Sequence, residues 1–573
     1  MSTHSAAAVP GRLPQSARRV PNFRDFAVPA VLFLAAVAVY APLIGWGVPH
    51  ATAPDRTKTV ATDEILPLEG LAEMHNTFVV SKPDRNYGYP WFHYFETAVV
   101  QVPYLVWARL SGEWDAPAPE FPFGFRDPVK ALRWLTWIGR FLSVLMAAGV
   151  VVAAFLFARN LWGHSAGVVA AVLTLLSYPM VYYSRTGNPD MPAAFWTSMG
   201  LVVYSMILRD GLTPGRGVWL GVFTGIAIAT KEQAVLIFLP LGASLLFSRQ
   251  RSWRPHLAAL AASMVAYMAA AGMLFDPHRH IEHVYRLLFQ PKLTNSMWFY
   301  RPGHPKNWEG TLAMMTEFIQ AMNWMHAAPV LLAAAAGAWV AARRTPRLLV
   351  LLAPMVLLYV CLVMPVRTVV LRYFLPMVPI VSGFAAYALV AMSRSKARRA
   401  AVPLMAVLCG WQLAIAVDLT YAQVRETRLS AAAWLENHAR AGDRIEYFGV
   451  REAMPPLPAE IQSRRIAGRE NWKKENGHGP RILQYLAAGG PEYVFIAPDV
   501  TSKPGIPFSG DCPPEVYEAL LGGRTNYTQV AYFPTPTLLP AWFRRPRLDY
   551  PSVAPPVRLF ARNDILTRSG ARP

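Results

Sequence analysis

The chain has 573 residues, of which 54% are hydrophobic and 16% are charged, and its mean hydropathy is +0.25. A soluble protein of this length needs more charge to cover its surface, so the composition excludes that class and indicates an integral membrane protein. The formal net charge of +20 favours Lys and Arg in cytoplasmic loops beside anionic lipid over a nucleic-acid-binding surface.

The first segment, Met1–Asp25, carries four arginines ahead of the apolar run Phe26–Trp46. This resembles the basic region of a signal peptide, but the run is long enough to cross a bilayer and lacks a clear small-residue cleavage site. We therefore predict a retained span whose N-terminus is a cytoplasmic tail.

Further apolar segments predict ten more spans, some of them tilted or broken. They are Trp137–Ala158, Ala166–Tyr183, Met191–Leu208, Gly217–Ala229, Ala234–Phe247, Leu257–Phe275, Ala327–Ala342, Leu348–Met364, Val369–Met392 and Ala401–Val417. The expected fold is a polytopic α-helical membrane protein of about 11 transmembrane helices, with residues 26–420 as the membrane domain and 47–136 as its first outer loop.

Charge predicts the orientation of these spans. If the first one runs outward, nearly all the short basic clusters fall in the even-numbered, cytoplasmic connections. These clusters contain Arg159, Arg209, Arg216, Arg249, Arg251, Arg254, Arg343, Arg344, Arg347, Arg394, Lys396, Arg398 and Arg399. The assignment requires Tyr94–Leu110, which Glu96 and Pro103 interrupt, to be an interfacial helix rather than a span.

Residues 421–573 have a different composition, with alternating helix and strand patterns that predict a small α/β domain on the outer face. The expected elements are helices at Leu429–Arg440 and Pro514–Leu521 and strands at Arg444–Gly449, Glu492–Ala497, Thr528–Phe533 and Val557–Arg562, with a proline-rich excursion at Pro534–Pro556. No nucleotide-binding loop, metal spacing or nucleophile elbow appears there. Two roles stay open: acceptor binding and structural cover.

The candidate chemistry begins at Asp63 and Glu64, two adjacent carboxylates in the first outer loop. An outer-face enzyme has access to sugars carried on polyprenyl phosphate. Transfer from such a donor needs a base for the acceptor hydroxyl, which Asp63 can supply, and cations for the departing phosphate. Arg185, Lys231 and Arg372 are predicted at outer span ends and can hold that phosphate. The aromatic run Tyr87–Phe95 suits either sugar stacking or an interfacial belt.

Several motifs, in this order, resemble the glycosyltransferase C (GT-C) superfamily, specifically glycosyltransferase family 39, which includes protein mannosyltransferases and bacterial aminoarabinose transferases. They are Asp63-Glu64, Tyr87-Gly88-Tyr89-Pro90-Trp91-Phe92-His93-Tyr94, Gly139-Arg140-Phe141-Leu142-Ser143, Ser184–Asp190, Ala229-Thr230-Lys231 and Arg372-Tyr373-Phe374-Leu375-Pro376. The resemblance covers about Phe26–Val417. It implies that Asp63 is the catalytic base and Asp190 a second essential acid.

The chain departs from the family at Asn86–Gly88, because the lysine often found before the Tyr-Pro-Pro pattern of the aminoarabinose branch is absent. Phosphate binding then falls to Lys82, Arg85 or the span-end cations. Trp91 stands where a second proline is common. The predicted substrate- and phosphate-binding residues are Arg140, Arg185, Lys231, Arg372, Tyr89 and His93, with Arg140 either anchoring the first-loop carboxylates or snorkelling.

A divalent metal is an open alternative, because one stretch of the loop after Phe275 is rich in His and acid. It contains Asp276, His278, His280, Glu282 and His283. Solvated loop charge explains the same residues, so no metal site is assigned. The three cysteines, Cys361, Cys409 and Cys512, imply neither a disulfide framework nor a zinc site.

These observations predict an inverting glycosyltransferase in a bacterial-type inner or plasma membrane, with its site on the outer face. Its partners would be a polyprenyl-phosphate sugar, membrane lipid and a protein, lipid or glycan acceptor, with no nucleic acid. A secondary transporter and a non-catalytic scaffold are the alternatives. The carboxylates in loops rather than mid-span disfavour a transporter.

Overall fold

The structure is a computed structural model of the whole chain. It describes residues 23–61, 63–65, 67–80, 89–247, 252–289, 304–367, 369–449, 452, 454–466, 478–497, 512–540 and 553–568. Of the predicted residues, Lys82, Arg85, Asn86–Gly88, Arg249, Arg251 and residues 541–552 of the proline-rich excursion lie outside this part of the chain.

The chain divides into two compact units. The first contains Met1–Ile44, Pro67–Gln101 and Ile138–Ala416, and the second contains Gly45–Leu66, Val102–Trp137 and Val417–Pro573. The boundaries expected from the sequence, after residues 25 and 420, stay a prediction.

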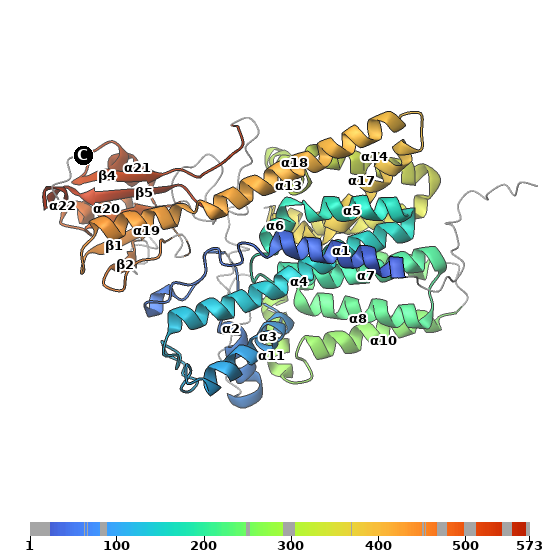
Figure 1. Cartoon of the computed structure of the whole chain (residues 1–573), viewed down its shortest axis with the longest axis horizontal. Coiled ribbons are helices and arrows are strands. Elements are labelled where there is room, and N and C mark those ends of the chain that lie inside the picture. The colour runs from blue at the N-terminus through green and yellow to red at the C-terminus, as the bar shows by residue number, and fades with distance from the viewer. Residues whose placement is uncertain are drawn as a thin grey trace, which may run out of the picture. The chain divides into compact units, whose positions relative to one another are not determined.

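Helices make up the first unit (Figure 1). In chain order they are α1 (Phe23–Tyr40), α2 (Glu69–His75), η2 (Asn76–Val80), α3 (Trp91–Leu110), α4 (Pro128–Trp162), α5 (His164–Leu175), α6 (Tyr178–Tyr183), α7 (Asp190–Asp210), α8 (Pro214–Thr230), η3 (Glu232–Ala234), α9 (Val235–Leu246), α10 (Arg254–Ala270), α11 (Pro277–Phe289), α13 (Trp308–His326), α14 (Ala328–Arg344), η4 (Pro346–Leu352), α15 (Ala353–Leu358), η5 (Tyr359–Val363), α16 (Met364–Val366), η6 (Leu371–Met377), α17 (Val378–Ser393) and α18 (Arg398–Val424). Of these, α3, α4 and α18 continue into the second unit.

Helical structure coincides with every predicted apolar segment, so the helical membrane fold is confirmed. Among the described residues, five helices are long and apolar enough to cross a membrane, or six if the bent pair α13 and α14 is one span. The total of eleven spans stays a prediction. The helix α3, where the sequence predicts an interfacial segment, is not one of the five.

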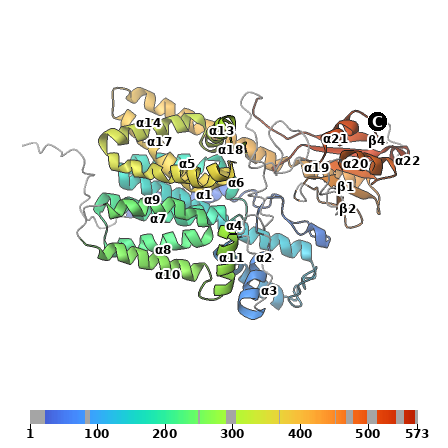
Figure 2. The ribbon, with the colours of Figure 1, turned by 180° about the vertical axis from the view of Figure 1, so that it is seen from behind.

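Two packed layers position the ends of these helices. The helix α8 packs between α7 and α10, and α17 packs between α5 and α14, as Figure 2 shows from behind. Small residues allow α8 and α10 to approach closely, because a Cβ at Gly221 would lie only 2.2 Å from the Ala259 carbonyl oxygen. Gly217 and Gly225 repeat the contact one turn away on either side.

This packing predicts a large stability effect at one glycine. Gly221→Val should destabilise the protein by about 1–3 kcal/mol or more, because the added side chain must push the α10 backbone away. Gly215→Val is the matched control on the same helix, since nothing lies within 4 Å of a Cβ there. Thermal unfolding of both variants in detergent tests the packing, and equal melting temperatures would contradict it.

The second unit contains a five-stranded sheet with strand order β2-β1-β3-β5-β4. Its elements are η1 (Pro54–Arg56), α19 (Thr427–His438), β1 (Arg444–Phe448), β2 (Gln462–Arg465), α20 (His478–Ala487), β3 (Tyr493–Ile496), α21 (Pro514–Leu521), β4 (Tyr527–Phe533), β5 (Val557–Arg562) and α22 (Asn563–Arg568). Strands β1, β2 and β3 are parallel, whereas β5 runs antiparallel to β3 and β4. All six predicted tail elements are present, and β2, α20 and α22 are additional.

Alternate residues of each strand face different helices, as a period of two requires. Ile445 and Tyr493 pack with Leu435 of α19 on one face of the sheet. Val494 and Phe560 pack with α20 and α21 on the other face. The sheet is therefore covered on both faces, which is the arrangement of a small α/β domain.

The same unit includes the loop that precedes Asp63. The Trp46 indole donates to Glu426 at 2.8 Å, and Glu426 also accepts two hydrogen bonds from Arg428. The Arg56 guanidinium donates to backbone carbonyls of the tail, including those of Leu457 and Ile461. The C-terminal domain thus holds the first loop through buried and half-buried polar contacts.

Candidate active site

Asp190, Lys231 and Arg372, which the sequence predicts at three separate span ends, line one pocket in the first unit. Its other lining residues are Ala193, Thr197, Gln233, Ala234, Ile237, Tyr373 and Pro376. The water-sized space inside this pocket is only about 10 Å³, which is room for about one water molecule, so a phosphate or a sugar hydroxyl enters it only if lining side chains move.

Asp190 and Lys231, both in the lining of this pocket, form a buried ion pair. Asp190 is the first residue of α7 and Lys231 follows the last residue of α8. The Asp190 carboxylate therefore lies at the positive end of the α7 dipole, and the Lys231 ammonium lies at the negative end of the α8 dipole. Both charges are stabilised by these dipoles. The ammonium of Lys231 also lies 5.3 Å from the centre of the Tyr373 ring, within the range of a cation–π interaction.

At least two of the buried oxygens that line the pocket have no hydrogen-bond partner among the described residues. They are Oδ2 of Asp190 and the hydroxyl of Thr197. Asp190 is 2% exposed and Thr197 is 0% exposed. Buried polar atoms of this kind usually have a partner, so a water or a ligand group is expected there. Because Asp190 Oδ2 is an acceptor, its natural partner is a hydroxyl donor.

Thr197 and Tyr373 were not assigned a role from the sequence. Thr197 lies seven residues after Asp190, two turns along the same face of α7, which is a signal that the sequence contained. Tyr373 is part of the Arg-Tyr-x-x-Pro motif, but its position beneath Lys231 depends on how η6 folds.

The side chains of three other predicted residues form hydrogen bonds with other groups of the protein. Arg140 is fully buried and donates to the Ile44 carbonyl at 2.8 Å. Arg185 donates to the carbonyls of Val39 and Tyr40 at the C-terminal end of α1, where helix carbonyls lack intrahelical partners. His93 contacts Gly187 and Glu96. Substrate binding by these three residues stays a prediction.

Tyr89 is fixed through its backbone. Its carbonyl accepts from Arg279 at 3.2 Å, and Arg279 forms a buried ion pair with Glu73 of α2. This pair joins α2 and α11 beside the start of α3. Tyr89 is half-buried, and its role in sugar contact stays a prediction.

Asp63 and Glu64 belong to the second unit, whereas the residues that line the pocket belong to the first. Asp63 has a φ of 57°, in the left-handed region that few residues other than glycine adopt. Glu64 is 8% exposed. Aspartate is among the few non-glycine residues that adopt this region readily, so the backbone conformation assigns no role to Asp63, whose function as the base stays a prediction.

The His- and acid-rich stretch after Phe275 forms separate pairs. His283 contacts Glu232, Glu282 pairs with Arg286, and Asp276 accepts from the backbone N–H of Arg279. Within the described part of the chain, no three His, Cys, Asp or Glu side chains gather closely enough to hold a metal ion.

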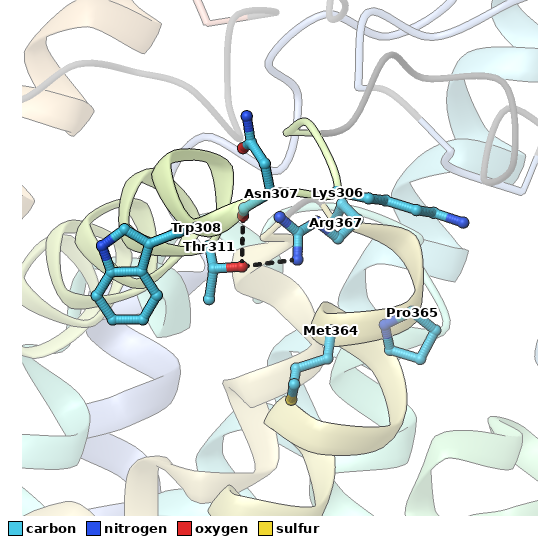
Figure 3. A pocket seen from close by; sticks show the side chains of 7 residues that line it. All are labelled: Lys306, Asn307, Trp308, Thr311, Met364, Pro365 and Arg367. Carbon is cyan, nitrogen blue, oxygen red and sulfur yellow. Dashed lines mark hydrogen bonds between the residues drawn. The ribbon is translucent and has the colours of Figure 1, made fainter.

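A second, more open hollow lies at the start of α13 (Figure 3). It is lined by Lys306, Asn307, Trp308, Thr311, Met364, Pro365 and Arg367. The Arg367 guanidinium donates to the Thr311 hydroxyl at 3.1 Å and to the carbonyls of His304 and Pro305. Arg367 therefore fixes the backbone that leads into α13.

The region that supplies Asp190 and Lys231 matches a known protein family. Residues 134–275, which contain Asp190 and Lys231, match the profile of the family described as dolichyl-phosphate-mannose-protein mannosyltransferase. The predicted resemblance is confirmed over this stretch. No curated protein matches the sequence.

Solved structures of three glycosyltransferases match over most of the chain. ArnT from Cupriavidus metallidurans, bound to undecaprenyl phosphate, is 15% identical with a TM-score of 0.42, covering 92% of this chain and 97% of that one. The oligosaccharyltransferase of Archaeoglobus fulgidus, with zinc and sulfate, is 11% identical with a TM-score of 0.42, covering 93% and 88%. The arabinofuranosyltransferase AftD from Mycobacteria is 17% identical with a TM-score of 0.40, covering 96% and 42%. At these TM-scores the similarity identifies no common site.

Proposed function

We propose that this protein is an inverting glycosyltransferase that moves a sugar from a polyprenyl-phosphate donor to an acceptor hydroxyl at the outer membrane face. The observation that carries the proposal is the pocket in which Asp190, Lys231 and Arg372 converge at the ends of apolar helices. The matching family profile, which is named for a lipid-phosphate-sugar donor, supports the same chemistry.

The reaction needs one base and one anion site. The acceptor oxygen attacks the anomeric carbon while the bond from that carbon to the phosphate oxygen breaks, which inverts the configuration. Asp63 accepts the hydroxyl proton, and the electron pair of the broken bond leaves on the polyprenyl phosphate. Lys231 and Arg372 stabilise the charge that develops on the departing phosphate.

Asp190 has two roles in this scheme. Through Oδ1 it pairs with Lys231 and fixes the position of the ammonium. Through Oδ2, which has no partner among the described residues, it can accept a hydrogen bond from a hydroxyl group of the sugar or acceptor. Arg140, Arg185 and His93 hold the backbone around the site in position, because their side chains contact backbone carbonyls.

The test uses the purified full chain with a membrane extract and radiolabelled sugars, presented singly as polyprenyl phosphates or as nucleotide sugars. Label should move from one polyprenyl-phosphate sugar to an extract component, and the Asp63→Asn protein is the matched control. Transfer directly from a nucleotide sugar, or from no donor in the series, would contradict the proposal.

A further inference from the structure

The loop that delivers Asp190 to the pocket runs from Ser184 to Pro189, between α6 and α7, and most of it is buried. Ser184, Thr186 and Asn188 have no exposed surface, and Arg185 is 3% exposed. A buried loop must satisfy its backbone polar groups internally, so each contact to it constrains where α7 begins. Arg185 supplies one such contact, to the last carbonyls of α1.

His93 supplies the second contact, from α3. Its ring is 2% exposed, with Nε2 3.0 Å from the Gly187 carbonyl oxygen and Nδ1 2.9 Å from a carboxyl oxygen of Glu96. A carbonyl oxygen only accepts, so Nε2 carries the hydrogen and donates it to Gly187. Both ring nitrogens are therefore used by the protein.

Glu96 fixes the orientation of that ring. It lies one turn after His93 on the same helix and is buried, and the burial raises the pKa of its carboxyl while the hydrogen bond with His93 opposes that rise. Whether the shared proton lies on Glu96 or on Nδ1, Nε2 remains the donor to Gly187. The contact to the loop therefore persists in both protonation states.

Gly187 lies only three residues before Asp190, with Asn188 and Pro189 between them. A shift of the Gly187 peptide moves the first turn of α7, and with it the carboxylate that pairs with Lys231. Misplacing a reacting group by about 1 Å can cost about 10²-fold in rate.

We propose that His93 is a positioning residue, which sets the place of Asp190 by donating a hydrogen bond to the Gly187 carbonyl rather than by touching substrate. Glu96 orients the His93 ring. A displacement of Asp190 changes the accessibility of the Lys231 ammonium, because the two side chains form an ion pair. The effect of His93 on catalysis rests on the proposed function. The effect of His93 on the position of Asp190 does not.

The test compares His93→Gln, which keeps an N–H donor, with His93→Phe, which keeps a ring and removes the donor. Acylation of Lys231 by an amine-reactive ester, measured by mass spectrometry on purified protein, should rise about 2- to 10-fold in His93→Phe, the range that one net hydrogen bond supports. His93→Gln should stay close to wild type. In the transfer assay, His93→Phe should lower kcat at unchanged donor KM, and His93→Gln should recover most of it.

Three results would overturn the assignment: unchanged Lys231 acylation in a folded His93→Phe protein, a rise in donor KM at constant kcat, or failure of the His93→Gln protein to fold. The acylation measurement needs no substrate. If the wild-type protein transfers no sugar, the proposed function fails, while the acylation result still decides the role of His93.

Discussion

Asp63→Asn is expected to lower kcat for sugar transfer by about 10²–10⁴-fold while the protein remains folded, because the amide cannot accept the proton of the acceptor hydroxyl. Asparagine has nearly the same shape as aspartate and tolerates the left-handed conformation that Asp63 adopts at a φ of 57°. Transfer kinetics and thermal unfolding of the purified variant measure the two expectations separately.

Two further substitutions at the same position separate chemistry from backbone strain. Asp63→Gly should be as inactive as Asp63→Asn and at least as stable, since glycine adopts this conformation without steric cost. Asp63→Ala should be equally inactive but less stable by about 1 kcal/mol. Substantial transfer by any of these three variants would exclude Asp63 as the base.

Lys231→Met is expected to destabilise the protein by about 3–5 kcal/mol, because it leaves the buried carboxylate of Asp190 without its charged partner. Methionine fills similar volume, so the loss reports the charge rather than a cavity. The double variant Lys231→Met/Asp190→Asn should recover most of the stability and none of the transfer activity. Chemical denaturation and the radiolabel assay measure these outcomes.

A Lys231→Met protein as stable as wild type would contradict a buried ion pair between Lys231 and Asp190. Recovered activity in the double variant would exclude both residues from the reaction. The two outcomes are independent, since the first concerns the ground-state structure and the second concerns the chemistry.

Much of the fold follows from hydropathy alone. Apolar runs are long and bounded by charge, so every predicted segment contains helix, including Ala166–Tyr183, which the structure breaks into α5 and α6 around Ser177. In the tail, β2 was missed because its sequence, Gln-Ser-Arg-Arg, has no apolar residue, and it forms an edge strand held by pairing with β1. Such a strand depends on its partner and has no signal of its own.

The candidate site was predictable where a charge stands at the end of a span. The charge pattern predicts Asp190, Lys231 and Arg372 at span ends on one side of the membrane. The structure brings the three residues to one pocket. The expected roles of Arg185 and His93 could not be refined from sequence, because their partners are backbone carbonyls that any residue carries. The left-handed backbone of Asp63 was equally invisible, since no glycine marks it.

The proposed transfer reaction requires the Asp63 loop and the start of α7 to face the same, outer side of the membrane. In a background without the three native cysteines, Lys58→Cys probes the first loop, and Gly215→Cys probes the start of α8, which follows the other end of α7. A membrane-impermeant maleimide applied to sealed right-side-out vesicles should label Lys58→Cys at once and Gly215→Cys only after permeabilisation. Equal labelling of both before permeabilisation, or protection of Lys58→Cys, would contradict a one-sided active site.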